Sequence, residues 1–187
     1  MNDNNWCEYS DLPSPLSYTN MNKTINKTIN SELRELSKIE HLTFNDNRGS
    51  YTPISTYQLG IEWDQCSIST NDKRGTFRGL HYQTNPPQTK YIKVIKGSII
   101  DFLYNLDTKE LKYFTLGSNE AILVPDNMAH GFLTLEDMTI VTYMVKGEYN
   151  PQSEHSIVWH TIDEVKQIIE SNIEGNLIIS DKDNEGK

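Results

Sequence analysis

The chain has 187 residues and a mass of 21.6 kDa, a length that fits one domain of ordinary size. Its net charge of -9, from 26 acidic and 17 basic residues, argues against a nucleic-acid surface or a polybasic membrane contact. No stretch reaches the roughly 20 apolar residues of a membrane span, and the N-terminus lacks the pattern of a signal peptide, so we expect a cytoplasmic protein.

The first 38 residues differ in composition from the rest of the chain. They are rich in Asn, Ser and Thr and contain the sequence Asn-Lys-Thr-Ile twice in tandem. Such a segment offers too little apolar surface to form a core, so we expect a mobile polar extension over residues 1–38 and one folded domain over residues 39–187. Cys7 and Cys66 lack the spacing of a metal site or a disulfide framework.

Residues 44–159 consist of short β-rich runs separated by turn clusters rich in Asn, Asp, Gly and Pro. This spacing predicts an all-β sandwich or barrel. The clearest strand covers residues 90–95, in which Lys90, Ile92 and Val94 share one face. If the two apolar residues face the core, Lys90 faces inward as well.

A helix is predicted near the C-terminus. Apolar residues recur there at helical spacing, at Ile162, Val165, Ile168 and Ile169. Thr161, followed three residues later by Glu164, has the form of a capping box. We therefore expect one short helix that begins near Thr161 and packs on the β domain.

The densest group of chemically functional residues lies between Arg78 and Lys90, with His81 between them. Arg can neutralise a phosphate, His can remove a carbon-bound proton, and Lys held against apolar walls can stabilise an enolate. Strict alternation would place Arg78 and His81 on opposite faces of a strand, but Gly79 permits a bulge that brings both to one cavity. A histidine in a strand is more often structural, and the nearby Arg and Lys favour the functional interpretation.

Two further residues have structural and functional interpretations that spacing does not separate. His130 follows a turn at residues 125–127 and begins another β-rich run, so it either fixes the turn or contacts a ligand. Tyr143 shares a strand face with Val141 and Val145. A core tyrosine with a satisfied hydroxyl would show the same pattern.

Five motifs in order along the chain carry a resemblance to a known family. They are Arg78-Gly-Leu-His-Tyr-Gln, Pro-Pro-x-x-Lys90, Lys96-Gly97-x-x-x-Asp101, Pro125-x-x-x-Ala-His-Gly-Phe132, and Tyr143 with Tyr149-x-Pro151 and Glu154. Over residues 44–159 the chain resembles the dTDP-4-dehydrorhamnose 3,5-epimerase family of cupins, and Ser180-Asp181-Lys182-Asp183 is similar to its C-terminal Ser-x-Lys-Asp motif.

The resemblance implies a cupin jelly roll, also called a double-stranded β-helix, that forms a homodimer. It implies an enzyme that epimerises a nucleotide-diphosphate sugar of the 4-keto-6-deoxy class, without a metal or redox cofactor, in deoxysugar and polysaccharide precursor biosynthesis. The 4-keto group acidifies the protons on C3 and C5, so removal on one face and return from the other inverts either centre.

The resemblance also implies roles for individual residues. His81 is expected to be the base, Asp183 its orienting carboxylate, Lys90 the stabiliser of the enolate oxygen, and Tyr143 the acid on the opposite face. The expected substrate-binding residues are Arg48, Gln65, Lys112 and Tyr113 on the nucleotide diphosphate side, with Arg78, Asp101, His130 and Tyr149 in the pocket.

The chain departs from the family pattern near the expected nucleotide site. The segment Tyr51-Thr52-Pro53-Ile54 lacks a family Glu, and Ser67 replaces an expected Asn, so base or sugar specificity is expected to differ.

Three alternatives remain beside the 3,5-epimerase. One inverts C3 or C5 alone on another nucleotide sugar, and another is a non-catalytic sugar-binding cupin. A metal-dependent cupin needs a cluster such as His-x-His with Glu and a later His, whereas this chain offers His81-x-Gln83, His130 and an ammonium, Lys90.

Overall fold

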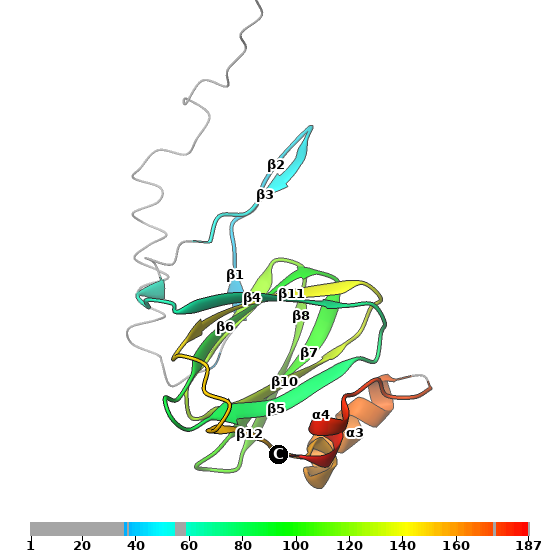
Figure 1. Ribbon diagram of the computed structural model, residues 1–187. Helices are drawn as coiled ribbons and strands as arrows, with labels where there is room; N and C mark the ends of the chain where they lie inside the picture. The colour runs from blue at the N-terminus through cyan, green and yellow to red at the C-terminus, as the bar shows by residue number, and fades with distance from the viewer. Residues whose placement is uncertain (1–35, 37, 55–58, 174, 187) are drawn as a thin grey trace, which may run out of the picture.

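Two antiparallel five-stranded sheets face each other and form a barrel (Figure 1). The computed structural model describes residues 36, 38–54, 59–173 and 175–186. Most of the predicted N-terminal extension, residues 1–35 and 37, lies outside the described residues. The first sheet has the strand order β1-β9-β6-β11-β4, and the second has the order β12-β5-β10-β7-β8.

The strand bounds are as follows: β1 Lys38–Glu40, β2 Phe44–Asp46, β3 Gly49–Tyr51, β4 Gln65–Asn71, β5 Phe77–Gln83, β6 Thr89–Lys96, β7 Ser98–Asn105, β8 Leu111–Gly117, β9 Glu120–Val124, β10 Met128–Thr134, β11 Thr139–Lys146 and β12 Glu154–Ser156. The helices that follow are a 3-10 helix, η2 (Trp159–Thr161), and two α-helices, α3 (Asp163–Asn172) and α4 (Asp181–Glu185). No helix within the described residues is long and apolar enough to cross a membrane.

The main core lies between the two sheets. It contains Ile92 and Val94 of β6, Ile99 and Leu103 of β7, and Phe132 of β10, all at most 1% exposed. Alternation along each strand sends these side chains inward. The predicted all-β jelly roll is confirmed, and so is the predicted inward face of the β6 strand.

A bulge interrupts the pairing of β5 with β10. His130 lies opposite His81, and Phe132 lies opposite Arg78. Between these two pairs, β5 therefore contains one residue more than β10. Gly79 has φ +128°, and a Cβ atom there would lie 2.4 Å from the Cα of Gly131. The predicted bulge is confirmed, and only glycine fits because the two backbones meet at this point.

The C-terminal helices pack beside the second sheet (Figure 1). Val165 and Ile169 of α3 are fully buried in an apolar cluster with Phe77, Leu80 and Phe102, which confirms the predicted helix. The predicted capping box is wrong. Thr161 ends η2 and its hydroxyl donates to the carbonyl of Val158 over 2.7 Å, so it is not available to cap α3.

A second C-terminal helix, α4, was not anticipated from the sequence. Its N-cap is Ser180, whose hydroxyl accepts a hydrogen bond from the backbone N–H of Asp183 over 3.2 Å. This arrangement is a standard way to satisfy an unpaired donor in the first helical turn. Asp183 is buried, and α4 therefore carries this carboxylate into the barrel wall.

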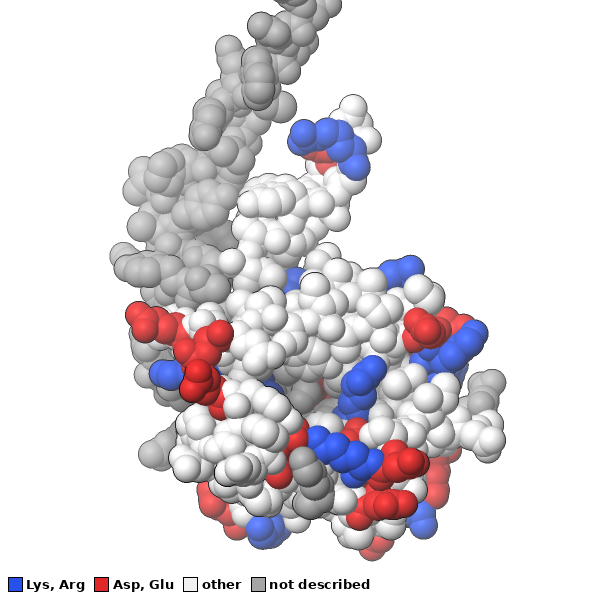
Figure 2. Space-filling view, viewed as in Figure 1, with Lys and Arg blue, Asp and Glu red and all other residues white. Residues whose placement is uncertain are grey.

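The β2–β3 hairpin stands clear of the barrel, at the end of the segment that continues from β1 (Figure 1). Its tip holds Arg48 close to Asp46, with a 2.6 Å ion pair between the guanidinium and the carboxylate. Figure 2 shows basic atoms beside acidic ones at this end of the hairpin. Elsewhere on the face shown in Figure 2, acidic and basic side chains are interspersed rather than segregated.

Candidate active site

A cavity of about 400 Å³ lies inside the barrel, with walls from both sheets and from the C-terminal segment. It is lined by Gln65, Ser67, Arg78, His81, Gln88, Lys90, His130, Phe132, Tyr143, Val145, Tyr149, Ser180, Lys182 and Asp183. Eight of the predicted site residues thus reach one cavity: His81, Lys90, Tyr143, Asp183, Arg78, Gln65, His130 and Tyr149. Concave sites of this size, lined by convergent polar groups, are typical of small-molecule binding.

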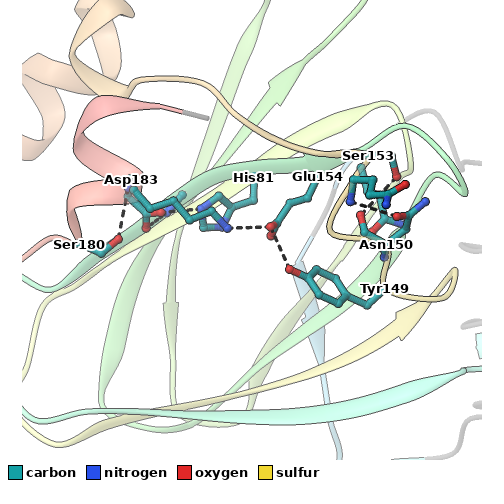
Figure 3. Close-up of polar contacts among 11 residues, drawn as sticks. His81, Tyr149, Asn150, Ser153, Glu154, Ser180 and Asp183 are labelled. Carbon is teal, nitrogen blue, oxygen red and sulfur yellow. Dashed lines mark hydrogen bonds and ion pairs between the residues drawn. The ribbon is translucent and has the colours of Figure 1, made fainter.

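His81 and Asp183 form a close pair although 102 residues separate them in the sequence. The Nε2 atom of His81 lies 2.7 Å from Oδ1 of Asp183, and the backbone N–H of Gly79 donates to Oδ2 over 3.1 Å. Figure 3 shows Asp183 and Ser180 on one side of His81. The carboxylate therefore fixes the orientation of the imidazole through one ring nitrogen, Nε2.

The environment keeps Asp183 ionised. Burial alone would raise the pKa of its carboxyl group, but the hydrogen bond and charge of His81 and the N–H of Gly79 outweigh burial and lower it. The imidazole side chain is 26% exposed, whereas the carboxylate is 7% exposed. A buried carboxylate that stays charged stabilises the imidazolium that forms when His81 takes up a proton.

Replacing Asp183 with asparagine should lower kcat on the order of 10³-fold while the fold survives. The amide keeps the shape of the side chain but no longer stabilises a protonated imidazole. Asp181→Asn, on the exposed side of the same helix, is the matched control. Steady-state kinetics with thermal unfolding of both variants measures the effect, and equal turnover in the two would show that the carboxylate does not support the base.

Lys90 projects into the cavity from β6, as its alternation with Ile92 and Val94 predicts. Burial lowers the pKa of its ammonium group to about 8, although the negative charges of Glu154 and Asp101 act in the opposite direction. Below that pH Lys90 is a cation in an environment of low polarity. Such a cation stabilises negative charge that develops on a nearby oxygen.

Tyr143 reaches the cavity from β11, which belongs to the first sheet, whereas His81 belongs to the second. The Tyr143 hydroxyl lies 2.9 Å from the hydroxyl of Ser69. Burial raises the pKa of the Tyr143 phenol to about 12, partly offset by the Ser69 hydrogen bond and the charge of Arg78. The Tyr143 phenol therefore keeps its proton at neutral pH, and it faces the cavity from the sheet opposite His81.

Arg78 and Gln65 are held by neighbouring polar side chains. Nε of Arg78 donates to Asn71 over 2.8 Å, which orients the guanidinium at the cavity wall. Gln65 donates to Ser67 over 2.6 Å. Ser67, the residue that replaces an expected Asn, thus lies in the cavity beside a predicted substrate-binding residue.

Three residues form a charged cluster next to the His81–Asp183 pair. Nζ of Lys182 lies 2.7 Å from Oε2 of Glu154, and the Tyr149 hydroxyl donates to the same oxygen over 3.1 Å. Figure 3 shows Glu154 and Tyr149 on the side of His81 away from Ser180. The hydrogen bonds and charge of Lys182 and Tyr149 overcome the effect of burial and lower the pKa of Glu154, while Glu154 raises that of Lys182.

Lys182 and Glu154 occur in the motifs on which the resemblance depends, but their sequence context predicts no role for either. Gln88 and Ser69 were likewise not singled out. Ser69 is placed beside Tyr143 by the pairing of β4 with β11, in which Ser69 lies opposite Val141. Only the strand register brings these residues together, and no local pattern signals it.

Asp101 was expected in the pocket, and the structure places it behind the cavity wall. It is fully buried, and its Oδ2 atom accepts a hydrogen bond from Nε2 of His130 over 2.8 Å. His130 is 5% exposed and lines the cavity. The histidine therefore faces the ligand space, and the carboxylate holds the histidine.

Arg48, Lys112 and Tyr113 lie outside this cavity within the single chain. Arg48 is at the tip of the β2–β3 hairpin. Lys112 lines a second cavity of about 270 Å³ with Asn105, Glu110 and Asn127. Tyr113, its neighbour on β8, is 49% exposed. The substrate-binding roles of these three residues stay predictions.

Comparison with known proteins identifies relatives across most of the chain. A family model described as dTDP-4-dehydrorhamnose 3,5-epimerase matches residues 30–187. A protein of that name from Methanothermobacter thermautotrophicus is 33% identical over 168 residues, which is 80% of this chain and 86% of the relative. Another from Mycobacterium tuberculosis is 34% identical over 115 residues, 57% of this chain, and the match spans only 55% of that relative's length.

A solved structure shares the fold. The Legionella pneumophila dTDP-6-deoxy-D-glucose-3,5-epimerase, described in complex with dTDP-4-keto-L-rhamnose, superposes with a TM-score of 0.71 at 27% identity. The superposition covers 83% of this chain and 88% of the Legionella chain. The similarity of fold therefore extends over most of both chains.

Proposed function

The chain belongs to the dTDP-4-dehydrorhamnose 3,5-epimerase family, and on this premise we propose that it inverts C3 and C5 of a dTDP-linked 4-keto-6-deoxy sugar. The observation that carries the proposal is the placement of His81 and Tyr143 on opposite sheets around one cavity. Inversion of a carbon centre through an enolate requires a base on one face and an acid on the other. The pair supplies both.

The reaction begins with removal of a proton from the carbon next to the 4-keto group. His81 takes the proton on the ring nitrogen that does not face Asp183, and the electron pair moves onto the keto oxygen to give an enolate. Lys90 stabilises the negative charge on that oxygen, since its ammonium is cationic below a pKa of about 8. No redox step occurs, because the carbon keeps its oxidation state throughout.

Tyr143 completes the inversion by giving its phenolic proton to the opposite face of the same carbon. The phenol has a pKa of about 12 because it is buried, so it holds its proton at neutral pH. The enolate is a strong base in a cavity of low polarity and takes that proton. Before the second carbon reacts, His81 gives its proton to solvent and Tyr143 takes one from solvent, so the same two residues act at C3 and at C5 in turn.

Arg78, Gln65 and Lys182 are the proposed contacts for the substrate's polar groups, and Tyr149 offers an exposed ring at the cavity wall for a planar group. The choice of a dTDP sugar is supported by the names of the relatives. We propose no metal for this site, because the described residues contain no group of three or more His, Cys, Asp or Glu side chains that could hold one, and the Lys90 ammonium shares the cavity. The cytoplasmic location stays a prediction.

We also propose a homodimer in which Arg48 reaches the cavity of the partner subunit. The hairpin that carries it points away from its own barrel (Figure 1), and a guanidinium group can pair with the phosphate oxygens of a nucleotide diphosphate. Arg48 is therefore expected to act in trans.

Mixing two inactive or weakened variants tests the action of Arg48 in trans. A heterodimer of His81→Asn and Arg48→Ala subunits has one cavity with an intact His81 and an intact partner Arg48. Its kcat/KM should exceed the mean of the two homodimers several-fold, whereas Arg48 acting within its own chain gives no such gain. The control uses Lys73→Ala in place of Arg48→Ala, because Lys73 also forms an exposed ion pair, with Asp137, but does not lie on the hairpin. Light scattering establishes the dimer.

The activity itself is tested with dTDP-4-dehydro-6-deoxyglucose and proton NMR of the product. We expect inversion at both C3 and C5. A product inverted at one centre would identify the single-centre epimerase, and an unchanged sugar that still binds would identify a sugar-binding cupin.

A further inference from the structure

Two polar side chains are buried on the outer face of the first sheet, where the proposed reaction does not use them. Tyr91 and Lys93 alternate along β6 with Lys90, which faces the cavity, so they point to the opposite side of the sheet. They are 0% and 2% exposed. Side chains on the outer face of a sheet are buried to this extent where another part of the chain covers them.

The cover includes the N-terminal arm, which we define as residues 38–54. Ile39 and Ile54 of the arm pack against a buried cluster that contains Tyr91. Between these two points the arm forms the β2–β3 hairpin, which stands clear of the barrel and carries Arg48 (Figure 1). The contacts between the arm and the sheet therefore determine where Arg48 lies.

His41 joins the entering side of the hairpin to the sheet. Its Nε2 atom is hydrogen-bonded to the hydroxyl of Tyr91, and the two rings meet edge to face with centroids 5.8 Å apart. Burial raises the pKa of the Tyr91 phenol, so this hydroxyl keeps its proton at neutral pH. Because β2 begins shortly after His41, at Phe44, the bond fixes the hairpin at its root.

The returning side of the hairpin is fixed through a turn. The hydroxyls of Thr43 and Thr52 lie 2.8 Å apart and join the two sides. The Thr52 hydroxyl donates to Oδ1 of Asn119 over 3.5 Å, and Nζ of Lys93 donates to the backbone carbonyl of Asn119 over 2.9 Å. Lys93 thus holds the turn between β8 and β9 on which the returning side rests.

We propose that His41 is a positioning residue whose bond to Tyr91 fixes the reach of Arg48 towards the nucleotide diphosphate, and that protonation of His41 releases the arm. This inference deepens the proposed function and rests on the role proposed there for Arg48. His41 does not touch the substrate, because its partner Tyr91 lies on the face of β6 that points away from the cavity.

A positive charge on His41 is unfavourable while the arm is fixed. Besides the phenol bonded to it, His41 faces the ammonium of Lys93 on β6, while Glu120 of β9 already pairs with Lys38 over 3.2 Å and Glu40 is exposed. Burial, followed by the charge of Lys93, lowers the pKa of His41 to about 4.

This lowered pKa gives the direction of the pH effect. In a released arm His41 has the ordinary pKa of about 6.5, so the fixed arm is fully favoured above that pH and loses stability as the pH falls from 6.5 towards 4. Lowering the pH to 5 shifts the equilibrium about 30-fold towards the released arm.

Calorimetric binding of dTDP to the full-length chain at pH 7.5 tests the role of His41. His41→Ala should raise the Kd about 5-fold, the equivalent of one hydrogen bond, whereas His41→Gln, which can still bond to Tyr91, should keep the wild-type value. Leu42→Ala, at the neighbouring residue of the arm, which is 44% exposed, is the matched control and should also keep it.

Arg48→Ala distinguishes positioning from general loss of structure. If His41 acts through Arg48, His41→Ala should cause no further loss of dTDP affinity in the Arg48→Ala background. A loss that persists there, an equal loss in Leu42→Ala, or an Arg48→Ala Kd equal to that of the wild type would overturn the inference. If the expected pattern occurs but no sugar is epimerised, the proposed function fails and the positioning role stands.

The ratio of the wild-type Kd to the His41→Gln Kd tests release by protonation, since glutamine does not titrate and protonation of the nucleotide cancels. The ratio should be about 1 at pH 7.5 and should rise several-fold at pH 5, together with faster hydrogen exchange of residues 38–54 in the wild type than in His41→Gln at the same pH. An unchanged ratio would overturn the release. If His41→Ala does not fold, Tyr91→Phe removes the same bond from β6 and replaces it in the binding test.

Discussion

Replacing His81 with asparagine should lower epimerase activity by about 10³-fold or more and abolish hydrogen exchange next to the 4-keto group. The other histidine that lines the cavity in the described part of the chain, His130, has a side chain only 5% exposed, whereas that of His81 is 26% exposed and so is the more accessible base. Asparagine keeps a hydrogen-bonding side chain beside Asp183, so the carboxylate is not left unpaired.

The measurement is deuterium uptake from heavy water into the sugar, followed by NMR. His155→Asn is the matched control, since His155 lies on the neighbouring strand β12 and stacks on Tyr82 rather than lining the cavity. Exchange that persists in His81→Asn at more than a few per cent of the wild-type rate would assign the base elsewhere.

Tyr143→Phe should separate exchange from inversion. His81 still removes a proton and returns deuterium to the same face, so exchange continues, while net inversion falls by about 10²-fold or more. The substitution removes one hydroxyl and its contact with Ser69, which costs about 1 kcal/mol of stability. The fold should survive.

Deuterium uptake and product stereochemistry are followed in the same sample to test this split. Tyr82→Phe removes a hydroxyl from the outer face of β5 and serves as the control. Equal losses of exchange and inversion in Tyr143→Phe, or normal inversion, would remove Tyr143 from the mechanism.

Local sequence patterns predicted those parts of the site that depend on neighbouring residues along one strand. Alternation with Ile92 and Val94 placed Lys90 inside the barrel. Gly79 predicted the bulge that brings Arg78 and His81 to one wall, and the structure confirms it through the 2.4 Å approach to Gly131. Both inferences follow from backbone geometry that acts over a few residues.

Contacts between distant segments were beyond the reach of these patterns. The partnership of His81 with Asp183 spans 102 residues, and it entered the prediction through a family resemblance rather than through spacing. Asp101 shows the same limit. Its motif placed it near the pocket, but only the strand pairing shows that it lies behind the cavity wall and holds His130.

The capping box failed for a local reason. Thr161 and Glu164 have the right spacing, but a 3-10 turn over Trp159–Thr161 precedes the helix and uses the Thr161 hydroxyl. A side chain that can bond either the preceding carbonyl or the following N–H does not by itself fix which helix it terminates.

The measurement that tests the central claim most directly is the position of deuterium in the product formed by the wild-type enzyme in heavy water. A base on one face and a solvent-equilibrated phenol on the other predict one deuteron at C3 and one at C5 of each inverted sugar, and none at C2. An inverted product that carries only its original hydrogens would contradict the account, because the incoming proton would then not come from Tyr143.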